Sequence, residues 1–181
     1  MNHILKNGTA LHNGEYVIQN FISQGGFGLT YEAIWEKQMK YKTLKERVVI
    51  KELFIDGRNL REKENAVTTQ SLSKEDFNHF KTRFIEEADT LAKFKHTGIV
   101  EVLDAFEENN TAYYVMEYID GVTLESYLHS RKDGLPEHEV IDIAKQLLSA
   151  LKEVHAHNIF HKDIKPQNIM RTAEGKITLI D

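Results

Sequence analysis

The segment Phe160–Asn168 gathers side chains that are well suited to chemistry: one His, two Lys, one Asp and one Asn. Asp163 could accept or orient the proton of a hydroxyl group, and Lys165 could neutralise a phosphoryl group during its transfer. The amide oxygen of Asn168 could ligate a hard cation. A polar loop that ends a helix would have a similar composition. Because Asp163, Lys165 and Asn168 stand within six residues of one another, the segment favours phosphoryl-transfer chemistry.

A glycine-rich segment, Ser23-Gln24-Gly25-Gly26-Phe27-Gly28, joins two predicted strands over residues 15–22 and 29–35. An ordinary hairpin turn is the simpler explanation of such a segment alone, and its glycines imply positive φ angles or a close backbone approach. No helix follows it, which excludes a dinucleotide-binding turn, and the Gly-Lys-Ser/Thr ending of a Walker loop is missing. What remains is a glycine-rich flap over phosphate groups.

Two further charged positions have less specific surroundings. Lys51 lies inside the apolar strand candidate 47–53, where a single lysine could simply point to solvent. Glu86 and Glu87 lie in the middle of a predicted helix, where acidic residues usually form a solvated face. From these residues alone, a solvated role and a functional role both stay open.

The elements that must position these residues follow from the spacing of apolar side chains. The first 118 residues predict one long helix and five strands, at 15–22, 29–35, 47–53, 99–106 and 112–118. The helix begins near Ser71–Glu75 and has an apolar stripe at helical spacing, which comprises Phe77, Phe80, Phe84, Ala88, Leu91 and Phe94. Residues 36–46 are a polar, Lys-rich connection, and residues 56–74 are polar without an assigned role.

The pattern becomes helical after residue 120. A short helix is expected around Leu124–Leu128, and a long amphipathic helix is expected from Pro136, a residue that a helix start tolerates, to His155. Short strands at 168–170 and 176–180 follow.

The composition excludes several classes of protein. There are 23 Lys and Arg against 28 Asp and Glu, a net charge of −5, and a nucleic-acid binder usually needs a basic surface. The absence of Cys excludes a disulfide scaffold, thiolate zinc sites and Cys nucleophiles. No apolar run approaches the roughly 20 residues of a membrane span, and the N-terminus does not resemble a signal peptide. We expect a cytoplasmic protein that binds neither nucleic acid nor membrane.

Taken together, the motifs resemble those of Ser/Thr protein kinases, up to the aspartate of the Asp-Phe-Gly motif. The segment Ser23–Gly28 with Thr30 is similar to the family's glycine-rich loop, and Val49-Ile50-Lys51 is similar to its third-strand lysine motif. The segment His96–Val100 resembles the family's His-Pro-Asn-Ile-Val segment. This register makes Glu87, not Glu86, the helix partner of Lys51.

The resemblance continues through the second half of the chain. Val115–Ile119 resembles the hinge, with Met116 as gatekeeper, and His161–Asn168 resembles the catalytic loop. Lys162 replaces the usual Arg, which keeps the charge but loses the bidentate fork. Asp181 stands at the spacing of the metal-binding aspartate. The segments Gly-Gly-Phe-Gly-Leu-Thr-Tyr and Lys-Glu-Leu-Phe are similar in sequence to those of bacterial members of the family.

The resemblance implies transfer of the ATP γ-phosphate to a Ser/Thr hydroxyl of a protein substrate, with ATP and Mg²⁺ bound. The loop residues would cover the phosphates: Ser23, Gln24, Gly25, Gly26, Phe27 and Gly28. The implied catalytic residues are Lys51 on the α- and β-phosphates, Glu87 holding it, Asp163 on the hydroxyl and Lys165 on the γ-phosphate. Asn168 and Asp181 would hold Mg²⁺. The implied adenine contacts are Thr30, Val49, Met116, Glu117, Ile119 and Met170.

The implied fold is α+β and protein-kinase-like. It has a small ATP-binding lobe at 1–118, with a five-stranded antiparallel sheet and one long helix, and a partial large lobe at 119–181 with the catalytic loop. Because later large-lobe helices are missing, we expect the 181-residue chain to be inactive by itself. We also expect it to self-associate, or to bind a partner chain, through the helix Val140–Val154.

Two other functional classes stay open. One is a non-catalytic nucleotide-binding or interaction module that uses the small lobe as a docking surface. The other is a small-molecule phosphotransferase with the same core. Lys165-Pro166 after Asp163, together with the hinge and the segment His96–Val100, favours the protein kinase branch.

Overall fold

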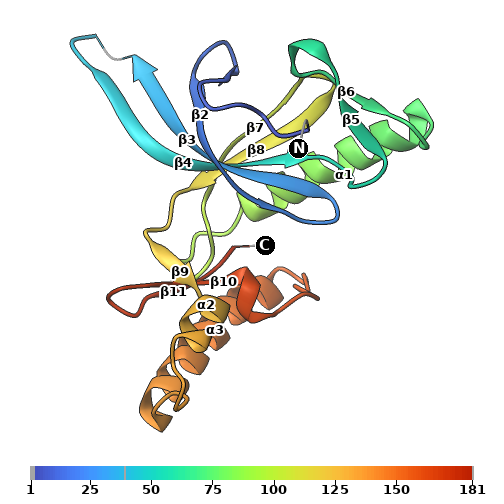
Figure 1. The fold of residues 1–181 in the computed structure, drawn as a ribbon. Helices are drawn as coiled ribbons and strands as arrows, with labels where there is room; N and C mark the ends of the chain where they lie inside the picture. The colour runs from blue at the N-terminus through green and yellow to red at the C-terminus, as the bar shows by residue number, and fades with distance from the viewer. Residues whose placement is uncertain (1–2, 39, 181) are drawn as a thin grey trace. The chain divides into compact units, whose positions relative to one another are not determined.

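The structure is a computed structural model that describes residues 3–38 and 40–180 (Figure 1). It divides into two compact units. The first comprises Met1–Ala92 and Val102–Tyr118, and the second comprises Lys93–Glu101 and Ile119–Asp181. The segment Lys93–Glu101 therefore belongs with the later residues, although it lies between two elements of the first unit.

An antiparallel sheet of six strands forms the first unit, in the order β1-β2-β3-β4-β8-β7. The strands are β1 (Ala10–Leu11), β2 (Tyr16–Gln24), β3 (Gly28–Gln38), β4 (Thr43–Leu53), β7 (Val102–Glu108) and β8 (Thr111–Glu117). The five predicted strands are present, and β1 is an addition. Strand β1 has only two residues, which is too short for an alternation of apolar side chains to show in the sequence. The turn after β1 places His12 and Asn13 at positive φ.

The hairpin of β3 and β4 is longer than expected. Residues 36–46 were predicted as a connection, but the ladder continues outward until Gln38 pairs with Thr43. Glu36 lies directly opposite Lys45 in this ladder, and the two side chains form an ion pair. Opposite charges on facing strand positions stabilise a sheet, so a polar segment can extend the hairpin.

The two edges of the six-stranded sheet contact each other. The backbone amide of His12, next to β1, donates to Glu108 of β7 at 2.7 Å, and the Tyr16 hydroxyl donates to Asp104 at 3.0 Å. The rings of His12 and Phe106 stack with their centroids 4.5 Å apart. Desolvation by burial and the hydrogen bond to Asp104 raise the pKa of Tyr16, so its hydroxyl stays a donor. These contacts curl the sheet around the apolar core.

The β7–β8 hairpin begins later in the chain than predicted. Asn109 and Asn110 form its turn with φ angles of 54° and 61°, as a type I′ turn requires. The strand predicted over 99–106 begins only at Val102, because Ile99 bridges to Leu179 in the second unit. An apolar run alone does not show which of two units it packs into.

Helix α1 (Lys74–Leu91) packs against β7 and β8. The helix starts within the predicted segment Ser71–Glu75, and Ser73 caps its N-terminus by accepting a hydrogen bond from the amide of Asp76. Phe84 of its buried face lies 4.8 Å from the Tyr114 ring, centroid to centroid. The predicted stripe is wrong at Phe94, which follows the helix and is buried in the second unit.

The segment between β4 and α1 has a regular structure that the sequence did not indicate. Two short strands, β5 (Asn59–Arg61) and β6 (Val67–Thr69), pair antiparallel around a 3₁₀ turn, η1 (Lys63–Asn65). We call residues 56–72 the insert. Three-residue strands are too short for their periodicity to predict them.

The second unit has a three-stranded sheet of β9 (Gly121–Thr123), β10 (Ile169–Thr172) and β11 (Ile177–Leu179). Helices α2 (Leu124–His129) and α3 (Glu137–Ala156) confirm the two predicted helices, and η2 (Pro166–Asn168) is one further turn. Gln146 of α3 accepts a hydrogen bond from the Ile177 amide at 2.9 Å, which attaches α3 to β11. Strand β9 was not predicted. Of the helices in the described ranges, none has an apolar stretch that could cross a membrane.

Candidate active site

The glycine-rich loop connects β2 and β3 in the first unit, as predicted. It is closed by a hydrogen bond of 2.8 Å from the Gly25 amide to the Gly28 carbonyl. Neither Gly25 nor Gly26 has a positive φ or a crowded Cβ position. At Gly28 a Cβ would lie 3.0 Å from the Glu52 carbonyl oxygen, so a close backbone approach explains this glycine alone. Gly25 and Gly26 place no side chain over the backbone at their positions, so a ligand can reach the backbone there.

Lys51 and Glu87 lie together in the first unit. Lys51 is on β4 and Glu87 on α1, and the Lys51 Nζ is 3.7 Å from the Glu87 Oε1. The predicted ion pair is therefore present. The Tyr114 hydroxyl of β8 donates to the same Oε1 at 3.2 Å, and its ring centroid is 5.4 Å from the Lys51 Nζ. Tyr114 thus contacts both members of the pair, a role that the sequence analysis missed.

The residues expected beside adenine in the first unit lie on one face of the sheet. Thr30 pairs with Lys51, and Val49 pairs with Met116, so all four side chains are on the face that α1 covers in part. Met116 is buried. Glu117 is the last residue of β8. A ligand next to Lys51 would contact this face first.

The catalytic-loop candidates lie together in the second unit, between α3 and β10. Asp163 Oδ2 accepts from Lys165 Nζ at 2.7 Å and from Asn168 Nδ2 at 2.9 Å. The same Asn168 nitrogen is 3.1 Å from the Asp163 carbonyl. Pro166 begins the turn η2, which brings Asn168 back toward Asp163. The three side chains predicted from their spacing therefore lie together, with Lys165 and Asn168 both bonded to the Asp163 carboxylate.

Lys162 sits in an uncommon backbone conformation, with φ at +64°. A non-glycine residue there has a cost, which is typical of residues that a functional site constrains. The Nε2 of the neighbouring His161 is buried and has no hydrogen-bond partner in the described part of the chain. The loop is thus set by its surroundings rather than by local preference.

The segment His96–Val100 packs against α3 and β11 within the second unit. His96 Nε2 is 3.0 Å from Ser149 Oγ of α3, and the Val100 amide donates to the Leu179 carbonyl at 2.8 Å. A Cβ at Gly98 would lie 3.2 Å from the Ala150 Cβ, so the absence of a side chain lets the segment lie close to α3.

Asp163 is an ionised acceptor. Its hydrogen bond from Lys165 contributes most to lowering the pKa of this exposed carboxyl. The hydrogen bond from Asn168 and the electrostatic effects of Lys165 and His161 also lower this pKa, against partial desolvation. A carboxylate with a lowered pKa is a weak base. It is better suited to orienting a hydroxyl group than to removing its proton early.

The metal ligands expected from the resemblance can be assessed by their donor chemistry. Asn168 is nearly buried, and its amide oxygen takes no part in the hydrogen bonds to Asp163. Amide and carboxylate oxygens suit Mg²⁺, so Asn168 and Asp181 fit this ion chemically. Asp181 lies outside the described residues. Among the residues described, no cluster of three His, Asp or Glu side chains could hold a metal ion without further ligands.

Two expected adenine contacts lie in the second unit. Met170 is on β10, where it pairs with Thr123 and Thr178, and Ile119 is the first residue of the unit after Tyr118. Both are partly exposed.

Comparison with known proteins gives a consistent result. Residues 16–181 match the protein kinase domain. The Ser/Thr-protein kinase PksC of Streptomyces coelicolor is 32% identical over 96% of this chain and 28% of its own length. PrkC of Bacillus subtilis is 38% identical over 58% of this chain and 16% of its own length. The chain therefore spans less than a third of these curated relatives.

Solved structures show the same fold. The apo form of PpkA-294 superposes with a TM-score of 0.85 at 27% identity, and the match covers 99% of this chain and 61% of that one. The PknI kinase domain of Mycobacterium tuberculosis has a TM-score of 0.68 at 23% identity, covering 98% of this chain and 61% of that one. The expected α+β, kinase-like fold is thus confirmed, and the chain belongs to the protein kinase family.

Proposed function

We propose that this chain is part of a Ser/Thr protein kinase of bacterial type that transfers the γ-phosphate of ATP to a Ser or Thr hydroxyl of a protein. One observation carries this proposal: Lys165 and Asn168 both donate hydrogen bonds to the Asp163 carboxylate. The names of the relatives support the choice of a Ser/Thr substrate. A protein that uses ATP in this way would work in the cytoplasm.

In the proposed mechanism the substrate hydroxyl donates a hydrogen bond to Asp163, which aims its oxygen at the γ-phosphorus. The new P–O bond forms as the bond to the β-phosphate oxygen breaks, and ADP leaves. The hydroxyl proton passes to the Asp163 carboxylate late in the step, which fits a weak base and a loose transition state. Lys165 turns from Asp163 toward the negative charge of the γ-phosphate.

The other proposed roles concern the nucleotide. Lys51, held by Glu87, binds the α- and β-phosphates, and the backbone amides of the glycine-rich loop cover them. Thr30, Val49, Met116 and Met170 contact adenine, and the backbones of Glu117 and Ile119 hydrogen-bond to it. When bound through Asn168 and Asp181, Mg²⁺ would neutralise charge on the β- and γ-phosphates. These residues position the reactants, which is most of what phosphoryl transfer requires.

The test is transfer of labelled γ-phosphate to a generic basic protein. We expect no transfer by the 181-residue chain, and transfer once it is joined to the remaining part of a kinase domain. Asp163→Asn should abolish the transfer by the joined form. If the joined form binds ATP but transfers nothing, a non-catalytic nucleotide-binding module is the better description. Transfer to a small molecule but not to the protein would favour a small-molecule phosphotransferase.

A further inference from the structure

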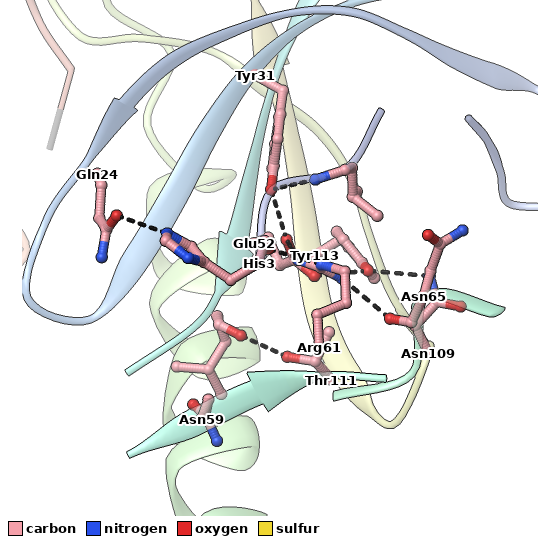
Figure 2. Close-up of polar contacts among 12 residues, drawn as sticks. His3, Gln24, Tyr31, Glu52, Asn59, Arg61, Asn65, Asn109, Thr111 and Tyr113 are labelled. Carbon is pink, nitrogen blue, oxygen red and sulfur yellow. Dashed lines mark hydrogen bonds and ion pairs between the residues drawn. The ribbon is translucent and has the colours of Figure 1, made fainter. Parts of the chain in front are cut away.

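The residue after Lys51 is a fully buried carboxylate. Successive side chains of a strand point to opposite faces, so Glu52 faces away from Lys51 and α1. It accepts hydrogen bonds from the hydroxyls of Tyr31 on β3, at 3.0 Å, and Tyr113 on β8, at 2.8 Å. Its third partner is Arg61 of β5, whose Nη2 lies 2.6 Å from Glu52 Oε2 (Figure 2). One carboxylate thus joins three strands of the sheet to the insert.

The protonation states of this cluster are fixed by burial and charge. Desolvation and the negative charge of Glu52 raise the pKa values of Tyr31 and Tyr113, so both hydroxyls stay donors. Burial disfavours the charged Arg61 guanidinium, but the hydrogen bond and charge of Glu52 outweigh it, and the pKa of Arg61 is raised. The Arg61 side chain is only 4% exposed. The ion pair is therefore a permanent anchor rather than a switch.

Arg61 also holds the N-terminal segment and the turn of the insert. Its Nε donates to the His3 carbonyl at 2.6 Å, and its Nη1 donates to the Asn65 carbonyl at 2.9 Å. The His3 ring in turn reaches the glycine-rich loop, with its Nε2 2.9 Å from Gln24 Oε1 (Figure 2). The buried Glu52–Arg61 pair is therefore connected to the glycine-rich loop through His3.

The beginning of the insert contacts the same loop. Gln24 Nε2 donates to Asp56 Oδ1 at 2.9 Å, and the Asp56 amide donates to the Gly26 carbonyl at 3.2 Å. The Phe54 amide donates to the Phe27 carbonyl at 3.1 Å. Four hydrogen-bonding groups thus contact the loop: the His3 ring, the Asp56 carboxylate, the Asp56 amide and, just before the insert, the Phe54 amide.

We propose that Asp56 and Arg61 are positioning residues for ATP: the insert, anchored by Arg61 on Glu52, holds the glycine-rich loop through Asp56 and His3. The idea rests on the proposed function, because it assigns the loop to ATP. It gives the insert the role that its sequence did not reveal. The loop would otherwise have to be ordered when ATP binds, and that ordering weakens affinity.

The experiment uses Asp56, because Asp56 is exposed and its removal leaves the buried pair intact. ATP affinity of the 181-residue chain is measured by calorimetry, and exchange of the glycine-loop amides is measured without ATP. We expect Asp56→Ala to weaken ATP binding about threefold to tenfold and to speed loop exchange. Asp56→Asn keeps an acceptor for Gln24 and should stay within about twofold of wild type.

Two further variants complete the design. Glu64→Ala removes an exposed negative charge from the same insert and should change neither measurement. Arg61→Lys keeps the charge beside Glu52 but cannot make all three guanidinium hydrogen bonds, so it should speed loop exchange and weaken ATP binding as Asp56→Ala does.

The possible results separate the two proposals. Unchanged loop exchange in Asp56→Ala and Arg61→Lys overturns the anchoring of the loop. Faster exchange with unchanged ATP affinity overturns the positioning role. A wild-type chain that binds no ATP contradicts the proposed function instead, and the exchange data then still decide whether the insert holds the loop.

Discussion

Tyr114 and Glu87 are joined by a hydrogen bond of 3.2 Å between the tyrosine hydroxyl and the carboxylate that pairs with Lys51. Glu87 is half exposed, so its charge alone would hold Lys51 weakly. The Tyr114 ring is buried and packs against Phe84 of α1. Tyr114 of β8 thus fixes the position of the Glu87 carboxylate, so Lys51 pairs with an oriented partner.

Removing the Lys51 charge should separate stability from nucleotide binding. The Glu87 side of the ion pair is half exposed, and such a pair contributes about 0–1 kcal/mol, so Lys51→Met should shift the Tm of the chain without ATP by no more than about 4 °C. ATP at 100 times its Kd stabilises by about 2.7 kcal/mol, and most of this gain should be lost. Thermal unfolding with and without ATP measures both effects. Equal ATP-induced shifts in variant and wild type would contradict the phosphate-binding role of Lys51.

The Tyr114 hydroxyl should matter less than the lysine itself. Tyr114→Phe keeps the buried ring but removes one hydrogen bond, which corresponds to about 0.5–1.5 kcal/mol. We expect ATP affinity to fall about twofold to tenfold, measured by calorimetry. Tyr127→Phe, which removes a tyrosine hydroxyl from α2 in the second unit, is the matched control and should leave ATP affinity unchanged. If both variants behave alike, Tyr114 does not orient Glu87.

The pKa of Asp163 should lie below the ordinary Asp value of about 3.9, because Lys165 and Asn168 stabilise the charged form. A lowered folded-state pKa stabilises the fold above the unfolded pKa, and this contribution is lost as the pH falls through the lowered value. The hydrogen bonds to Asp163 should therefore persist at neutral pH. Carboxyl NMR titration checks this, and Lys165→Met should raise the pKa. An unperturbed pKa in wild type would show that the contacts of Asp163 are absent in solution.

Sequence patterns found residues whose partners lie on regular elements or in the same loop. The helix start near Ser71–Glu75 was evident because helix-start signals are local, and Asp163, Lys165 and Asn168 could be grouped because a short loop contains all three. The pairing of Lys51 with Glu87 followed from the family's register. Residue type and spacing were sufficient for the loop, whereas the Lys51–Glu87 pair needed the resemblance to the family.

Contacts between irregular segments were not predictable. Arg61 lies in a polar stretch, and no periodicity shows that it is buried against Glu52. The role of Asp56 depends on the course of a turn, and Tyr114 is one aromatic residue within an apolar strand. Phe94 fits the stripe of α1 by spacing, but it is buried in the other unit because the helix ends at Leu91.

Mg²⁺ should bind only together with nucleotide. Asn168 and Asp181 are two oxygen donors, and Mg²⁺ usually completes its shell with substrate phosphates and water. Calorimetry should detect no Mg²⁺ binding by the chain alone and tighter ATP binding when Mg²⁺ is added. Asn168→Ala should reduce that gain, whereas Gln167→Ala, an exposed amide next to it, should not. Tight Mg²⁺ binding in the absence of ATP would mean that protein oxygens alone form the site.

The 181-residue chain should self-associate through α3. Ile143, Ala150 and Val154 are buried on one side of this helix. Ile141 and Leu148, on the opposite side, are 45% and 65% exposed, and Val140, between the two sides, is 49% exposed. Leaving apolar area in water costs about 25 cal/mol per Å², and such patches usually mark interaction sites. A second copy of the chain offers the same apolar face, so a symmetric pairing of two α3 helices would cover both.

Light scattering should therefore give a mass above the 21.0 kDa of one chain at micromolar concentrations. Leu148→Glu places a charge in the centre of the exposed face and should return the mass to that of a monomer. Leu103→Glu is the matched control, because Leu103 is 41% exposed on β7 of the first unit and is not part of α3, so its replacement should leave the assembly intact. A wild-type chain that stays monomeric, or equal effects of both substitutions, would show that this face of α3 does not pair with itself.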